Sequence, residues 1–233
     1  MNKRFLPFLL AAFTLHLGGC ITIEENYAFK KDGSGTMTYV LDMRQMAEML
    51  KSFGDDGKEQ GDAGDMGKMS IGAQAETLKG IAGISKVKLD TKTEWVQSLS
   101  FAFTDIDALN RALNALMPDS ADVQHTFFRK EGNALVRTSN SYVHQLAGAM
   151  LSEGAMGEGG EDDDGTGFDL NAMLGMMKYK YSFKFKQPVE TAEASSALVK
   201  EDTGSKEVKY STDWAAIAKD PKSLDLRIGL KGK

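Results

Sequence analysis

Few side chains in this sequence have the types and spacing that catalysis needs. His125 and His144 are far apart, and no His-x-x-x-His or His-Glu-x-x-His arrangement is present, so the ligand spacing of a zinc hydrolase is missing. Ser34 lies between two glycines without a Gly-x-Ser-x-Gly frame, which is typical of a turn, and Walker, Rossmann and β-lactamase patterns are missing too. We therefore expect no enzymatic activity, no metal centre and no cofactor. An unrecognised hydrolase that depends on His125 or His144 is the enzymatic alternative.

Two acidic clusters contain the carboxylate oxygens that calcium prefers, Asp55-Asp56 and Glu161 to Asp164. Neither has the Asp-x-Asp-x-Asp-Gly loop with a distal glutamate that an EF-hand uses. Consecutive acids in glycine-rich sequence are typical of solvated loops, so we expect no calcium site.

Residues 178–186 alternate with the period of a β-strand. One face is aromatic, with Tyr179, Tyr181, Phe183 and Phe185. The other face carries four lysines, Lys178, Lys180, Lys184 and Lys186. Four ammonium groups on one strand face form a candidate site for an anionic headgroup or glycan phosphate. The alternative is a solvated sheet face that the lysines protect from aggregation.

Methionines recur at helical spacing in two segments, Met43, Met46 and Met49, and Met173, Met176 and Met177. Methionine is flexible enough to line an adaptable groove for a lipid or a peptide. The same spacing is also typical of an ordinary helix face in a core.

The first residues have the organisation of a secretory signal. Lys3 and Arg4 precede an apolar run from Phe5 to Leu17. That run is shorter than the roughly 20 residues of a membrane span, and no downstream segment approaches that length.

The end of this run, Leu17-Gly18-Gly19-Cys20, resembles the lipobox of bacterial lipoproteins, and Cys20 is the single cysteine. The resemblance implies recognition of Leu17, Gly18 and Gly19 by lipoprotein signal peptidase, removal of residues 1–19, and attachment of diacylglycerol, with acyl chains such as palmitate, to the Cys20 thiol. Two or three chains anchor a protein stably, whereas one binds marginally. Ile21 stands where an aspartate would retain a lipoprotein in the inner membrane, so the resemblance implies the outer membrane.

The mature chain, residues 20–233, is then one acidic domain. Removing Lys3 and Arg4 takes the formal charge from −5 to −7, so nucleic acid is not an expected partner. A lone cysteine allows no intrachain disulfide, and the core must hold the fold. Glycine and aspartate alternate near 54–68 and again near 153–167, which predicts two flexible insertions.

Periodicity and turn residues predict the remaining elements. We expect strands at 21–29, 36–41, 85–89, 94–103, 123–130, 134–138, 178–186, 198–200, 206–211 and 224–228. We expect helices at 43–50, 74–79, 106–117, 142–151, 168–177 and 214–218. Short turns between strands favour antiparallel pairing, so the predicted fold class is α+β, a twisted antiparallel sheet with helices packed on one face.

The Asp32-Gly33-Ser34-Gly35 turn and the Phe101-x-Phe103-x-Asp105-Ile106 junction resemble those of envelope lipoproteins and, distantly, of the mycobacterial LppM type. That resemblance implies an antiparallel α+β domain that binds lipid. The leading hypothesis is thus a non-enzymatic envelope lipoprotein, tethered through Cys20, that binds a lipid or an envelope protein. The alternative is a structural or assembly lipoprotein that acts only by protein contact.

Overall fold

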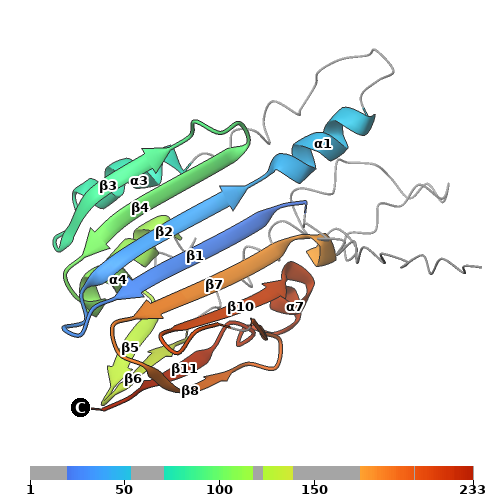
Figure 1. The fold of residues 1–233 in the computed structure, drawn as a ribbon. Coiled ribbons are helices and arrows are strands. Elements are labelled where there is room, and N and C mark those ends of the chain that lie inside the picture. Colours follow the sequence, from blue (N-terminus) through green and yellow to red (C-terminus); the bar gives the residue numbers. More distant parts are fainter. Residues whose placement is uncertain (1–19, 54–70, 118–122, 139–173, 202, 233) are drawn as a thin grey trace, which may run out of the picture.

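Two β-sheets and a few short helices make up the fold, which Figure 1 shows as a ribbon. This computed structural model describes residues 20–53, 71–117, 123–138, 174–201 and 203–232. The predicted helix at 142–151, the predicted insertions and most of the predicted helix at 168–177 lie outside these residues.

The larger sheet has seven strands in the order β3-β4-β2-β1-β7-β10-β9. Their bounds are β1 (Thr22–Phe29), β2 (Gly35–Asp42), β3 (Ile84–Asp90), β4 (Val96–Phe103), β7 (Lys178–Phe185), β9 (Val199–Glu201) and β10 (Glu207–Asp213). All neighbours are antiparallel except β1 and β7, which run parallel in register from Thr22 opposite Lys178 to Phe29 opposite Phe185. The antiparallel pairing of β1 with β2 across the predicted turn is thus confirmed, and β7 lies on the other side of β1.

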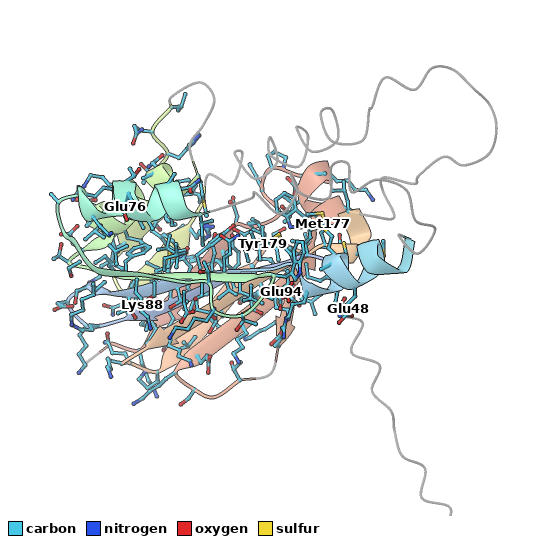
Figure 2. The ribbon with its side chains drawn as sticks, turned by 90° about the horizontal axis from the view of Figure 1, so that it is seen from above. Glu48, Glu76, Lys88, Glu94, Met177 and Tyr179 are labelled. Atoms are coloured by element: carbon cyan, nitrogen blue, oxygen red, sulfur yellow. The ribbon has the colours of Figure 1, made fainter. Side chains whose placement is uncertain are left out.

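The smaller sheet has the order β5-β6-β11-β8. Its strands are β5 (Phe128–Glu131), β6 (Ala134–Arg137), β8 (Val189–Ala194) and β11 (Leu226–Leu230). Side chains of β5 and β6 pack on the same face of the larger sheet that the helices α3 (Gly72–Lys79) and α4 (Ile106–Leu116) cover. Figure 2, seen from above, shows these helices on one side of the larger sheet.

The remaining helices lie at the end of the larger sheet where β1 begins. These are α1 (Arg44–Phe53), which continues from β2, and α7 (Trp214–Lys219), which continues from β10 (Figure 1). Met177, directly before β7, lies at the same end of the sheet, as Figure 2 shows. Aspartates that precede α4 and α7 cap them, because Asp105 accepts from the Ala108 N–H at 2.7 Å and Asp213 from the Ala216 N–H at 2.9 Å.

The core is an aromatic layer on the inner face of the larger sheet. In β1, alternation buries Ile23, Tyr27 and Phe29, while Ala28 is exposed. The parallel register stacks Tyr27 on Phe183 with ring centroids 5.1 Å apart, and Phe29 on Phe185 at 5.7 Å. These contacts give β1 and β7 apolar partners on both neighbouring strands and across the core.

The predicted α+β class with a mainly antiparallel sheet is confirmed, and two features extend it. Strand β8 was not predicted, because it shows no strict alternation of apolar and polar residues. The division into two separate sheets was not predicted either. The parallel β1–β7 pair joins segments far apart in the chain, so no local turn signal announces it.

The strand predicted at 123–130 begins only at Phe128, and two side chains of α4 bind the backbone at and before that residue. Asn110 donates to the Phe128 carbonyl and accepts from its N–H, both at 2.8 Å. Asn114 binds His125 in the same two ways, at 2.8 and 2.7 Å. These two asparagine clamps take the place of a neighbouring strand.

Removing either clamp by mutation should reduce the protection of nearby backbone amides from hydrogen exchange. We expect Asn110→Ala to lower the free energy of unfolding by about 2 kcal/mol, because two backbone groups lose their partners. The amide of Phe128 should exchange faster in that variant, and the amide of His125 in Asn114→Ala, as read by hydrogen-exchange mass spectrometry or NMR. Asn26→Ala, on the solvent face of β1, serves as the control, and equal effects in all three variants would contradict the clamp.

Candidate functional site

Cys20 lies where the chain enters the larger sheet, with Ile21 as the single residue between it and β1. Its N–H donates to the Met176 carbonyl at 2.9 Å, and its carbonyl accepts from the Met46 N–H at 2.9 Å. The residue is 8% exposed, and burial raises the pKa of its thiol. Leu17, Gly18 and Gly19 lie outside the described residues.

The methionines near Cys20 mostly belong to the core. Met43, Met46 and Met177 are buried, and Met176 is 44% exposed. The side chain of Met49 and residue Met173 lie outside the described part of the chain. The described methionines therefore fit the core interpretation of the pattern better than an open groove.

The four lysines of β7 and its end do not form one uniform cationic face. Lys178 donates to the Gly175 carbonyl at 2.9 Å. Lys180 lies 3.8 Å from the Glu24 carboxylate on β1, and Lys184 lies 3.6 Å from that of Glu207 on β10. Because neighbouring strands supply these carboxylates, much of the positive charge that the strand pattern predicts is balanced across the sheet.

A different group of lysines gathers at the end of the larger sheet opposite Cys20. The β1–β2 turn, the end of β7, the β9–β10 turn and β5 meet there. We call this surface the lysine end and define it by Lys30, Lys31, Lys130, Lys184, Lys186 and Lys206. The C-terminus of the chain lies at the same end (Figure 1).

Two hollows cross the lysine end, and Phe29 and Phe185 line both of them. The larger, of about 500 Å³, carries Lys184, Lys186 and Lys206. The smaller, of about 60 Å³, carries Lys30, Lys31 and Lys130. Phe29 and Phe185, whose stacked rings are buried, are thus the residues that the two lysine-lined hollows share.

The carboxylates near this end are already engaged. Asp32 accepts from the hydroxyl and the N–H of Ser34, and these bonds lower the pKa of Asp32. Glu131 binds Arg227 and Arg129, which lower its pKa. Glu207 lies near Lys184 and Lys209. Ser34 thus has a role in the turn, as its sequence context predicts.

Of the two candidate histidines, the structure describes His125. The backbone of His125 is clamped by Asn114, and its ring lies 5.7 Å from that of Phe127. His144 lies outside the described residues. Within the described ranges no group of three or more histidine, cysteine, aspartate or glutamate side chains could hold a metal ion.

Sequence reasoning missed the most unusual polar group of the molecule, a buried ion pair between the two sheets. Glu25 on β1 and Arg137 on β6 are both 0% exposed, and Arg137 Nη2 donates to Glu25 Oε2 at 2.9 Å. The hydroxyl of Tyr27 donates to Oε2 at 2.6 Å, and that of Tyr179 donates to Oε1. Arg137 Nε donates to the Tyr181 hydroxyl at 3.1 Å. We call these five residues the buried polar centre.

The environment keeps the tyrosines neutral and the arginine charged. Burial, reinforced by the charge of Glu25, raises the pKa of Tyr27 and of Tyr181 well above the usual value. Burial alone would lower the pKa of Arg137, but the charge of Glu25 and the surrounding tyrosines raise it overall. The guanidinium carbon also lies 4.6 Å from the centre of the Tyr181 ring and 5.2 Å from that of Phe128.

The buried polar centre connects the two sheets and has a structural role. Neither hollow of the lysine end reaches its atoms. One signal in the sequence could have revealed it, because Glu25 occupies an inward position in the alternation of Ile23, Tyr27 and Phe29. Arg137 carries no comparable signal, since its strand is buried at every position.

Comparisons with known proteins add little to this geometry. No protein-family model matches the chain, and no curated protein matches it. Among solved structures, the NMR structure of the folded domain of Mycobacterium tuberculosis LppM is similar, with a TM-score of 0.42 and 11% identity over 100% of this chain and 97% of that one. A similarity at this level carries no argument about function. Among the described helices, none is long and apolar enough to span a membrane.

The buried polar centre predicts a large and asymmetric effect of mutation. Glu25→Gln should lower the free energy of unfolding by about 3 kcal/mol or more, because it leaves the Arg137 charge buried without its counter-ion. Glu25→Gln combined with Arg137→Met should recover much of that loss, as measured by urea denaturation in a double-mutant cycle.

Glu24→Gln is the matched control, because Glu24 is the adjacent residue and pairs with Lys180 on the solvent face. It should change stability by less than about 1 kcal/mol. An effect of Glu25→Gln no larger than that of Glu24→Gln would contradict the structural role of the pair.

Proposed function

We propose that this protein is a bacterial envelope lipoprotein, tethered through a diacylglycerol on Cys20, whose α+β domain acts by binding and not by catalysis. The lipobox Leu17-Gly18-Gly19-Cys20 motivates the anchor. The observation that carries the proposal is the position of Cys20 directly before the first described strand. Ile21 alone separates it from β1, so a cut before Cys20 leaves every described strand of both sheets in the mature chain.

Processing at Cys20 is compatible with its backbone contacts. A free amine and an acylated amide both keep an N–H, so either can donate to the Met176 carbonyl as the peptide N–H does. The Cys20 carbonyl keeps its bond from Met46 in every case. The anchor would therefore join the lipid to the body of the domain without a flexible linker.

This attachment orients the domain with respect to the membrane. Strand β1 starts at the anchor and has eight residues, or about 26 Å. The lysine end lies at the far end of that strand, so we place it away from the bilayer that holds the acyl chains. The outer membrane is our proposed location, because Ile21 does not provide an inner-membrane retention signal.

The anchor is tested by the intact mass of the full-length chain expressed in a bacterium. We expect loss of residues 1–19 and a mass gain equal to two or three acyl chains, with the protein in the membrane fraction. Cys20→Ala should abolish the gain and the membrane association, because the thioether cannot form. A wild-type protein without added acyl mass that fractionates like Cys20→Ala would contradict the proposal.

Lipid binding and purely structural contact make different predictions for the Cys20→Ala chain. Native mass spectrometry of that chain, purified without detergent, should show retained lipid if the domain binds lipid. A single unliganded species, together with crosslinks to one envelope protein in cells, would favour the structural or assembly alternative.

A further inference from the structure

The lysine end concentrates positive charge on a chain whose formal charge is −5. Five of its lysines are exposed and have no ion pair among the residues that the structure describes: Lys30, Lys31, Lys130, Lys186 and Lys206. The sixth, Lys184, shares Glu207 with Lys209. The nearby carboxylates of Asp32 and Glu131 are occupied by Ser34 and by two arginines. These lysines are therefore available to an anion from outside the chain.

The backbone that presents the lysines is held in place. The Lys30 N–H donates to the Ser34 carbonyl at 2.7 Å, and Gly33 adopts a φ of +89°, which closes the β1–β2 turn. In the β9–β10 turn, the Lys206 carbonyl accepts from the Phe185 N–H at 2.9 Å and the Ser205 carbonyl from the Val189 N–H at 2.7 Å. Only the side chains lose freedom when a ligand binds, which lowers the entropic cost of binding.

The arrangement of charge fits an extended ligand better than a small one. Each hollow is lined by three lysines, and Phe29 and Phe185, each 6% exposed, contribute to both linings. The two sets of lysines are therefore neighbours at one end of the larger sheet. A single small anion meets only one set, whereas a linear polyanion crosses both. The free cations are lysines, which contact tetrahedral phosphate as point charges, while the nearby Arg129 and Arg227 are taken up by Glu131.

We propose that the lysine end binds a linear phosphate-bearing polymer that contacts the lysines of both hollows. The site itself does not depend on the lipid anchor. Its role in the envelope rests on the proposed function, because attachment at Cys20 turns the lysine end away from the bilayer and toward polymers outside it. This site is assembled from four segments of the chain, whereas the sequence pattern predicted an anion site on the lysines of β7 alone.

The test measures binding of fluorescently labelled short-chain inorganic polyphosphate to the full chain in detergent micelles. We compare Lys31→Gln/Lys186→Gln/Lys206→Gln with a control of equal charge, Lys92→Gln/Lys219→Gln/Lys222→Gln, whose exposed lysines lie near the Cys20 end. The first variant should bind about tenfold more weakly or worse and show a shallower dependence on salt, because it has fewer counter-charges. The control should bind as the wild type does. Circular dichroism and urea denaturation confirm that both variants fold.

Three outcomes would overturn the proposal: no binding by the wild type, equal loss in the two variants, or equally tight binding of poly-glutamate, which would indicate an acidic protein partner. The same measurement on the Cys20→Ala chain separates the two proposals. Polyphosphate binding that persists there supports the lysine end even if acylation fails. Acylation without polyphosphate binding leaves the anchor intact and overturns the site.

Discussion

The ion pair between Glu25 and Arg137 joins the two sheets inside the core, where neither charge can be buried without the other. Two charges removed from water cost several kcal/mol each, and close pairing with further hydrogen bonds offsets that cost. Two tyrosine hydroxyls and the guanidinium donate to Glu25, and Arg137 gains a further tyrosine oxygen and the faces of two rings. An alternative packing of the sheets would leave one of these charges buried alone, so the pair specifies one arrangement.

The parallel pairing of β1 with β7 gives the domain two different ends. It places Cys20, Met176 and Met177 at the beginning of both strands. It also brings the ends of both strands together, with Lys30 after β1 and Lys186 after β7. The proposed attachment point and the proposed binding surface therefore lie at opposite ends of the same strand pair, with the aromatic layer between them.

Elements with strong local patterns could be predicted from the sequence. The turn at Asp32 to Ser34 and the alternation of residues 178–185 each rest on neighbours a few positions away, and both are confirmed. Residues 123–127 were predicted as strand and are not, and the backbone of His125 is bound there by the Asn114 side chain. The lysine pattern of β7 could not reveal that Glu24 and Glu207 lie beside it.

The sequence by itself determined the α+β class and most strands and helices, because hydrophobic periodicity and turn chemistry act over short distances. It also singled out Cys20 as the candidate anchor. Only the tertiary structure decided that Glu25 is buried against Arg137, 112 positions away, and that lysines from four segments share one surface. Both depend on which distant strands pair, and pairing is set by the packing of the whole core and not by any local signal.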